Sequence, residues 1–451
     1  KLEEMHVKGR QLEAIKPGDR IELGCFKVEF IKTGHSIAGA IALAISTPIG
    51  TVIHTGDFKV DFTPIDGEPI DINRFAHYGS RGVLALLSDS TNIERQGYTQ
   101  SERELGAAFE HYFEAAHGRV IVASFASNVY RIQQVADVAI SHGRVLCFQG
   151  RSMEQVVQIA MKLGYLKIPA DRIVNVDQLK RYRDEQICVF TTGSQGEPMS
   201  ALYRMAFGGH AQISLGPNDL VVLSSSSIPG NEKAISNIIN ELYKRGVNVL
   251  DDNIADVHVS GHACREELKL IHALVKPDNF VPVHGEYRHL VKHAALAREL
   301  GMPDNRILIP ETGRVIELDK RSMRFGQTVP SGQILVDGYG VGDVGTSVLR
   351  DRKHLAEDGI LIIVAAIDFY TNTIVSGPDI TSRGFVYVKE AEALMEEVHK
   401  ACIKIIERCL KRGAKDVEVI KTRMKDELAG MIVNKTKRKP MILPLLMTAD
   451  L

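Results

Sequence analysis

The sequence predicts an α/β protein of more than one domain, and three observations support this fold class. The chain has 451 residues, whereas a single hydrophobic core rarely grows past ~250 to 300 residues. From residue 101 onward, short β-rich runs alternate with helical segments, which is typical of a mostly parallel sheet. Glycine- and serine-bearing loops follow these runs, at the strand ends where open α/β sheets bind ligands. We therefore expect two or three domains.

Composition describes an ordinary globular protein and excludes several classes. Hydrophobic residues make up 44% and charged residues 25% of the chain, which is neither disordered nor fibrous. The net charge is -1 and the pI is near 7.0, so nucleic-acid binding must be confined to a local groove. The six cysteines are scattered and predict reduced thiols rather than a disulfide framework or a zinc ribbon.

The apolar runs are too short for a membrane protein. None reaches the ~18 residues that a membrane span needs, and the residues from Lys1 to Glu4 do not resemble a secretory signal. We expect a cytoplasmic protein with no membrane partner.

The order of the elements follows from local patterns. Strands are expected at 21–31, 40–47, 51–55 and 82–88. Ser101 and Glu104 form a capping-box signature before a helix. Further strands are expected at 120–124, 145–148, 187–191 and 220–224, alternating with helices. A strand at 257–259, a helix at 265–274 and a strand at 280–283 then suggest a return to the first domain.

The last hundred residues predict a compact α+β segment after a linker. Four glycines between 337 and 346 indicate the linker. A strand is expected at 360–367, a turn at 376–378 and an amphipathic helix from 391 to about 411. A basic stretch at 435–439 precedes an apolar tail at 441–447, which we expect to be buried.

Four side chains that suit metal chemistry stand in polar, glycine-bearing loops beside apolar strands. They are His35, Asp57, His262 and His284. Imidazole and carboxylate groups are the usual ligands of hydrolytic zinc or manganese. One histidine at a strand end is usually structural, but four such residues together indicate a metal-dependent hydrolase.

Longer motifs resemble a known family. They are His54-Thr-Gly-Asp-Phe-Lys, Leu87-Ser-Asp-Ser-Thr-Asn, Thr192-Gly-Ser-Gln-Gly-Glu-Pro, Ser225-Ser-Ser-Ile-Pro-Gly-Asn-Glu, Val259-Ser-Gly-His-Ala, Pro282-Val-His-Gly-Glu-Tyr-Arg, Ser376-Gly-Pro-Asp-Ile, Ser382-Arg-Gly-Phe-Val-Tyr and Lys435-Thr-Lys-Arg-Lys-Pro. In this order they resemble the ribonuclease J family, in the β-CASP branch of the metallo-β-lactamase-fold nucleases. The resemblance covers essentially the whole chain.

This resemblance implies a domain plan. A metallo-β-lactamase αββα sandwich would occupy 1–100 and 257–336, with a β-CASP α/β domain inserted at 101–256. A linker at 337–352 would lead to a small C-terminal α+β domain at 353–451. The family's H-x-H-x-D-H motif, which supplies four further ligands, is not present in the sequence. We expect it upstream of Lys1, so that the N-terminal part of the sandwich is missing; the alternative is a degenerate active site.

The resemblance also implies roles for the site residues. His35 would be a metal ligand, Asp57 would bridge two divalent ions, and His284 would bind the second ion. Zinc is favoured, with manganese or magnesium as alternatives. Asp89 matches the acidic residue that orients ligands. His262 matches the histidine over the scissile phosphate, and its alternative is a cap for the helix that follows.

Phosphate binding is expected at the loops of the inserted domain. Ser124, Ser127, Asn128 and the loop 224–231 offer hydroxyls, amides and backbone N–H groups. In the family, the segment Ser260, Gly261, His262 and Ala263 completes a pocket for a 5′-monophosphate. The implied activity is 5′-to-3′ exonuclease cleavage of single-stranded RNA, with endonuclease cleavage as well, in RNA maturation and decay. We also expect a homodimer or homotetramer and further partners in RNA degradation.

Two other functions remain open at this point. One is a DNA nuclease of the β-CASP group, although the family resemblance associates histidine at position 284 with RNA and valine with DNA. The other is a non-catalytic subunit that binds RNA or a nuclease through the same fold. The four residues His35, Asp57, His262 and His284 argue against it.

Overall fold

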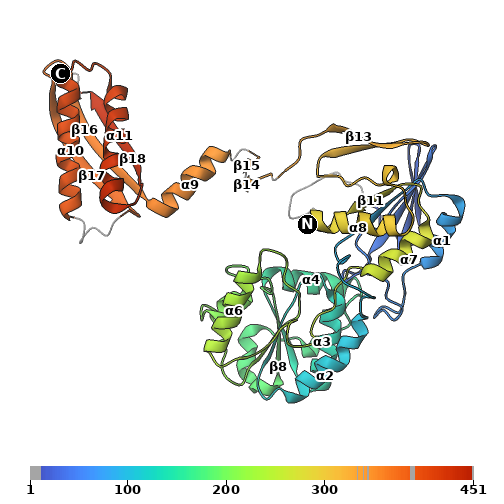
Figure 1. Cartoon of the computed structure of the whole chain (residues 1–451). Helices are drawn as coiled ribbons and strands as arrows, with labels where there is room; N and C mark the ends of the chain where they lie inside the picture. The colour runs from blue at the N-terminus through green and yellow to red at the C-terminus, as the bar shows by residue number, and fades with distance from the viewer. Residues whose placement is uncertain (1–11, 333, 339, 343–344, 386–391, 449–451) are drawn as a thin grey trace. The chain divides into compact units, whose positions relative to one another are not determined.

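The computed structural model describes residues 12–332, 334–338, 340–342, 345–385 and 392–448 (Figure 1). The chain divides into two compact units between Ser331 and Gly332. The first unit contains a six-stranded sheet and a five-stranded sheet, and the second contains a three-stranded sheet. No described helix is long and apolar enough to cross a membrane.

The six-stranded sheet has the order β1-β2-β3-β4-β5-β11. Its strands are β1 (Arg20–Leu23), β2 (Phe26–Lys32), β3 (Ile41–Thr47), β4 (Gly50–His54), β5 (Ala85–Asp89) and β11 (Phe280–Val283). β2, β3 and β4 are successively antiparallel, whereas β4, β5 and β11 are parallel. Strands β2, β4, β5 and β11 therefore run in the same direction, and their carboxyl ends lie at one edge of the sheet.

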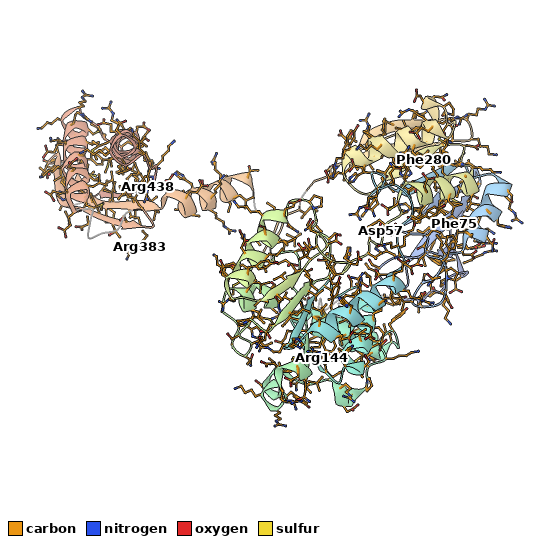
Figure 2. All side chains as sticks on the ribbon, turned by 60° about the horizontal axis from the view of Figure 1, so that its bottom comes forward. Asp57, Phe75, Arg144, Phe280, Arg383 and Arg438 are labelled. Atoms are coloured by element: carbon orange, nitrogen blue, oxygen red, sulfur yellow. The ribbon has the colours of Figure 1, made fainter. Side chains whose placement is uncertain are left out.

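Three helices pack near this sheet. They are α1 (Ile72–Arg81), α7 (Arg265–Val275) and α8 (Tyr287–Glu299). Phe75 and Phe280, both fully buried, belong to one core, and Figure 2 shows both within this part of the first unit. Helices α1 and α7 approach closely at Gly79, where a Cβ atom would lie 2.0 Å from the carbonyl oxygen of Leu274. A hairpin, β12 (Arg314–Leu318) and β13 (Met323–Thr328), follows.

A buried carboxylate connects β2 to its neighbours. Glu29 accepts hydrogen bonds from Arg74 and Tyr78 of α1 and from Arg20 of β1. Burial alone would raise the pKa of Glu29, but the hydrogen bonds from Arg74, Tyr78 and Arg20 outweigh burial and hold that pKa at about 2. Glu29 therefore carries a negative charge at neutral pH.

The five-stranded sheet is entirely parallel, with the order β10-β9-β6-β8-β7. Its strands are β6 (Val120–Ala123), β7 (Val145–Gln149), β8 (Ile187–Thr191), β9 (Leu220–Leu223) and β10 (Asn248–Leu250). Every residue of β6, β8 and β9 is buried, as expected for a sheet that is covered on both faces. Alternate residues of β6 belong to two different cores, which lie on the two faces.

Helices surround this sheet, and α2, α3, α4 and α6 can be followed around β8 in Figure 1. The helices are α2 (Leu105–Ala115), α3 (Val129–Ser141), α4 (Arg151–Lys162), α5 (Ala201–Ala206) and α6 (Glu232–Lys244). Short 3₁₀ turns are η1 (Glu102–Glu104), η2 (Ala170–Arg172), η3 (Val176–Arg181), η4 (Asp184–Gln186) and, after α8, η5 (Asp304–Arg306).

A fully buried arginine ties together segments that are distant in the sequence. Arg131 of α3 donates to Glu102 at 2.7 Å, to the hydroxyl of Ser224 at 2.5 Å and to the carbonyl of Val257 at 2.8 Å. The strand expected at 257–259 is wrong, because this segment has no strand partner and is not assigned as a strand. Its carbonyl at Val257 bonds to Arg131 and Ser224 instead of to a sheet.

The second unit is a three-stranded sheet with two long helices. Its elements are β14 (Val336–Asp337), β15 (Gly340–Val341), α9 (Thr346–Asp358), β16 (Ile360–Asp368), β17 (Thr373–Arg383), α10 (Glu392–Lys411), α11 (Val417–Thr436) and β18 (Met441–Thr448). β16 is central, antiparallel to β17 and parallel to β18. Alternate residues of β16 share one core with α10 and α11, which Figure 1 shows running beside the strands.

The structure corrects several local expectations in the first unit. The strand expected at 21–31 is a hairpin of two strands, with its turn at Gly24 and Cys25. Ser101 does not form a capping box with Glu104. It caps the 3₁₀ turn η1 by accepting from the backbone N–H of Arg103, and its hydroxyl contacts Asp61.

Other corrections concern the second unit. The linker expected at 337–352 is regular structure from Thr346, where α9 begins. The turn expected at 376–378 lies within β17, where the pairing with β16 shifts register. Helix α11 was not expected at all. The apolar tail at 441–447 is a strand that alternates between buried and more exposed positions rather than a uniformly buried segment. Ala391, expected to begin the long helix, lies outside the described residues.

Candidate active site

The candidate site lies at the carboxyl edge of the six-stranded sheet. Asp57 follows β4, Asp89 ends β5, and His284 follows β11, while His262 lies in the loop before α7. One ligand atom from each of these four residues lies within 4.8 Å of the others. Figure 2 shows Asp57 in the same part of the first unit as Phe75 and Phe280. Residues from four separate parts of the chain are thus brought together.

His35, which follows β2, faces the same carboxylate. Its Nε2 lies 3.9 Å from Oδ2 of Asp57, and its Nδ1 lies 2.7 Å from the carbonyl oxygen of Gly261. Burial lowers the pKa of His35, so the neutral ring is favoured. Gly261 must be glycine, because a Cβ atom there would lie 2.5 Å from Nδ1 of His35. Nδ1 thus donates to the backbone, and Nε2 keeps a free lone pair.

His284 approaches Asp57 from the other side. Its Nε2 lies 3.7 Å from Oδ1 of Asp57, and its Nδ1 lies 2.7 Å from the hydroxyl of Thr91. The backbone of His284 is left-handed, with a φ of 61°, a conformation that costs roughly 1–3 kcal/mol outside glycine. The nearby carboxylate of Asp89 raises the pKa of His284.

Asp89 contacts one imidazole directly, that of His262, and reaches a second, that of His284, through the hydroxyl of Thr91. Oδ2 lies 2.7 Å from Nδ1 of His262, and Oδ1 accepts from the backbone N–H and the hydroxyl of Thr91. Burial raises the pKa of Asp89, but the hydrogen bond from His262 and the nearby ring of His284 outweigh burial and place that pKa well below the usual range. Both oxygens are therefore occupied by protein donors. We interpret Asp89 as an orienting carboxylate rather than a direct metal ligand.

The three imidazoles form a row. The ring centroids of His35 and His262 are 5.0 Å apart, and those of His262 and His284 are 5.3 Å apart and stacked. His262 does not act as a side-chain cap for α7, whose N-cap residue is Cys264. Its Nδ1 is held by Asp89 instead, which leaves Nε2 for other contacts.

Sequence reasoning missed three residues that fix the loop around His262. Asn92 and Thr99 both donate to the carbonyl oxygen of His262, at 3.0 and 2.8 Å. The fully buried carboxylate of Glu267 accepts from the backbone N–H groups of Cys264, Thr99 and Val60. Asn92 stands in the block that begins at Leu87, so the motif offered a signal for it. Thr99 and Glu267 offered none, because their role depends on how the loops meet.

The predicted phosphate-binding residues fall into two groups. Ser260, Gly261, His262 and Ala263 lie in one loop, and the hydroxyl of Ser260 already accepts from Asn92 and from the N–H of His262. This loop contacts both His35 and Asp89.

The second group lies between β6 and α3. Asn128 is the N-cap of α3, and its side-chain oxygen accepts from the N–H of Arg131. Ser124 is buried, whereas Ser127 is exposed. Among the described residues, no hydrogen bond joins this group to the loop 260–263.

The loop 224–231, which follows β9, is held by a side chain from the loop after β8. Gln195, which follows β8, donates to Ser225 and to the carbonyl of Ser226, and it accepts from the N–H of Ile228. Ser224 donates to the carbonyl of Val257. These polar groups therefore shape the loop, and Gln195 is a further residue that sequence reasoning did not single out.

The donor set suits a divalent metal. Nε2 of His35 and of His284 both face the carboxylate of Asp57. Neutral imidazole and carboxylate bind zinc and manganese in proteins. The orientation of each ring by a hydrogen bond at Nδ1 is the arrangement that usually supports metal-bound histidine.

Comparison with known proteins agrees with this chemistry. Residues 117–242 match the ribonuclease J β-CASP domain, residues 246–310 the RNA specificity domain of zinc-dependent metallo-hydrolases, and residues 347–449 the ribonuclease J C-terminal domain. Ribonuclease J 1 of Streptococcus pyogenes is 43% identical over 423 residues, which cover 94% of this chain and 75% of that protein. The chain belongs to the ribonuclease J family. Ribonuclease J2 of Bacillus subtilis (41% identity, 98% of this chain, 80% of that protein) and ribonuclease J of Thermus thermophilus (42%, 98%, 76%) are similar relatives.

Membership confirms the general function that the motifs predicted. The protein is a metallo-hydrolase ribonuclease that uses divalent metal and binds RNA as its substrate. Its fold is that of the metallo-β-lactamase nucleases with an inserted β-CASP domain and a ribonuclease J C-terminal domain. The ribonuclease function is favoured over a DNA nuclease or a non-catalytic subunit, and RNA processing and decay fit the family.

Proposed function

We propose that this ribonuclease degrades RNA from its 5′ end, prefers a 5′-monophosphate and also cleaves internally, with two divalent ions that are preferably zinc. The observation that carries the metal assignment is the position of Asp57. Nε2 of His35 is 3.9 Å from Oδ2 of Asp57, and Nε2 of His284 is 3.7 Å from Oδ1. A carboxylate approached from both sides in this way is suited to bridging two ions.

Each protein group has a defined task in this proposal. Divalent ions held by these residues would supply an activated water and would neutralise charge on the phosphodiester oxygens. Asp57, His35 and His284 hold the ions, while Asp89 orients His284 and His262. His262, with Nδ1 fixed on Asp89, directs Nε2 toward the leaving 3′ oxygen and donates a proton to it. Activity assays with zinc, manganese and magnesium, each added to metal-free enzyme, test the preferred ion.

The proposed 5′-phosphate pocket depends on backbone groups and on one exposed hydroxyl. Ser124 is buried, and the side-chain oxygen of Asn128 is used to cap α3. Ser127 is exposed, and the backbone of 260–263 lies beside the candidate site. Backbone N–H groups and a hydroxyl can bind phosphate without a net positive charge.

A comparison of RNA ends tests this pocket. RNA with a 5′-monophosphate should be degraded several times faster than the same RNA with a 5′-triphosphate, because the longer and more charged end does not fit. Ser127→Val should remove this preference, whereas Ser236→Val, at an exposed serine of α6, should keep it. Equal rates on both ends with the unmodified enzyme would rule out the pocket.

We also propose that the C-terminal unit joins two copies of the chain. In β18, Leu443, Leu445 and Met447 are 38%, 45% and 58% exposed, on the face opposite the core shared with α10 and α11. An apolar sheet face of this kind is suited to pairing with the same face of a second copy.

Two matched variants test the interface. Leu445→Glu should convert dimers or tetramers to smaller species in light scattering. Val419→Glu, at a similarly exposed position of α11 (50%), should leave the assembly intact. A monomeric unmodified protein at micromolar concentration would contradict the proposal. We further place the enzyme in the cytoplasm with its RNA substrates, which cell fractionation checks.

A further inference from the structure

Thr91 lies between the carboxylate of Asp89 and the imidazole ring of His284. Its hydroxyl oxygen is 2.7 Å from Oδ1 of Asp89 and 2.7 Å from Nδ1 of His284. Its backbone N–H donates to the same Oδ1 at 3.0 Å. Thr91 comes two residues after Asp89 but 193 residues before His284, so one hydroxyl connects the ends of β5 and β11.

The positions of the hydrogen atoms follow from these contacts. Asp89 accepts at both oxygens, from Thr91 and from His262, as an ionised carboxylate does. The single hydroxyl proton of Thr91 is therefore donated to Asp89. Oγ1 of Thr91 can then only accept from Nδ1 of His284, which must carry the ring proton.

This proton assignment determines which atom of His284 can bind metal. With the proton on Nδ1, the lone pair of the neutral ring is on Nε2, which faces Oδ1 of Asp57 at 3.7 Å. Asp89 itself is 3.4 Å from Nδ1 of His284, too far for a good hydrogen bond. Thr91 is thus the group that selects the metal-binding tautomer.

The backbone of His284 supports the same conclusion. A φ of 61° is unusual for a residue other than glycine. Such a conformation persists only when surrounding contacts hold it. The hydroxyl of Thr91 is the contact that meets the ring of His284 at hydrogen-bond distance in the described residues.

We propose that Thr91 is a positioning residue, which fixes the tautomer and orientation of His284 and thereby sets the affinity of the site for its second divalent ion. The inference rests on the proposed function of His284 as a metal ligand. Residues that hydrogen-bond to metal ligands typically change metal affinity by ~10–100-fold when they are replaced.

The experiment compares variants of the full-length enzyme by their affinity for zinc, measured by competition with a chromogenic chelator. Thr91→Val removes the hydroxyl but keeps the size of the side chain. Thr91→Ala removes the hydroxyl and leaves a smaller side chain, and Thr91→Ser keeps the hydroxyl. Thr47→Val is the matched control, because the hydroxyl of Thr47 donates to the carbonyl of Gly50 at 2.8 Å, in a turn at the opposite end of the same sheet. Melting of the metal-free proteins reports on the fold.

The expected result is a loss of affinity for one of two zinc ions by ~10-fold or more in Thr91→Val and Thr91→Ala. Thr91→Ser and Thr47→Val should stay close to the unmodified enzyme. Unchanged affinity in both the valine and alanine variants would overturn the proposal, and so would a serine variant as weak as valine. If the unmodified full-length enzyme bound no second ion, the proposed metal site itself would fail, which is a separate outcome.

Discussion

The carboxyl edges of the two sheets in the first unit differ in how their polar groups are used. At the edge of the six-stranded sheet, Asp57 has no short hydrogen bond to a donor among the described residues, and the Nε2 atoms of two histidines face it. At the edge of the five-stranded sheet, Arg131 is fully paired with Glu102, Ser224 and Val257. One edge leaves lone pairs available, and at the other the charge of Arg131 is compensated within the protein.

The difference separates chemistry from architecture. A group without a protein partner at a strand end adds little to stability, so it can be devoted to a ligand. A buried charge must be compensated by its neighbours, so it contributes to the fold and is not free for a substrate. Substitution of Asp57 at the first edge should therefore change activity without unfolding the protein, and substitution of Arg131 at the second should destabilise the fold.

The largest expected effect is at Asp57. In the full-length enzyme, Asp57→Ala should lower RNA hydrolysis by more than ~100-fold. The loss of a direct metal ligand should have a larger effect than the loss of a residue that only hydrogen-bonds to a ligand. RNA binding and the melting temperature of the metal-free protein should change little. The rate of hydrolysis is measured with saturating metal, and RNA binding is measured with a filter-binding assay. Asp171→Asn, on the exposed turn η2, is the control, and normal turnover by Asp57→Ala would exclude its role.

An intermediate effect is expected at Arg131. Arg131→Met leaves the carboxylate of Glu102 buried without its partner, which should lower the free energy of unfolding by about 3–5 kcal/mol. Denaturant titration of the first unit's transition measures this loss. The double variant Arg131→Met with Glu102→Leu should recover part of it, because no buried charge then remains. A single variant as stable as the unmodified protein would show that the two edges do not differ in this way.

The smallest effect is expected at Glu29, which anchors the strand that leads to His35. Glu29→Gln should lower the free energy of unfolding by about 3 kcal/mol at neutral pH, since the folded pKa of Glu29 is about 2 and its ordinary value is 4.5. A carboxyl with a lowered pKa stabilises the fold above its unfolded pKa. The difference between the two proteins should therefore shrink as the pH falls from about 4.5 toward 2.

Glu22→Gln provides the control for this titration. Glu22 pairs with Lys27 on the hairpin of β1 and β2, with both side chains about 70% exposed, and exposed pairs contribute little. A difference for Glu29→Gln that stayed constant with pH would mean that the charge of Glu29 does not stabilise the fold.

The sequence predicted the main features of the site because they are local. His35, Asp57 and His284 stand beside apolar strands in recognisable motifs, and parallel strands of one sheet deliver their carboxyl ends to one edge. Most strands of the first unit were predicted for the same reason, since β6, β8 and β9 read as short buried apolar runs.

The features that were missed depend on tertiary contacts. Thr91 stands in the motif that begins at Leu87, but its role arises only when β11 brings His284 beside it. The segment 257–259 has an apolar pattern that suits a strand, but Arg131 occupies its carbonyl. Helix α11 buries Ile420, Met424, Leu428 and Ile432 at a uniform spacing of four, a narrow stripe that is easily overlooked.

The pairing of β5 with β11 has a consequence for the synthesis of the protein. Leu86 is paired with Phe280, and the whole five-stranded sheet is made between them. At ~5–20 residues per second, His284 leaves the ribosome roughly 10 to 40 s after Asp89. Throughout that interval the nascent chain carries Asp57 and Asp89 without His284. The candidate site is therefore complete only after the chain has been made through His284.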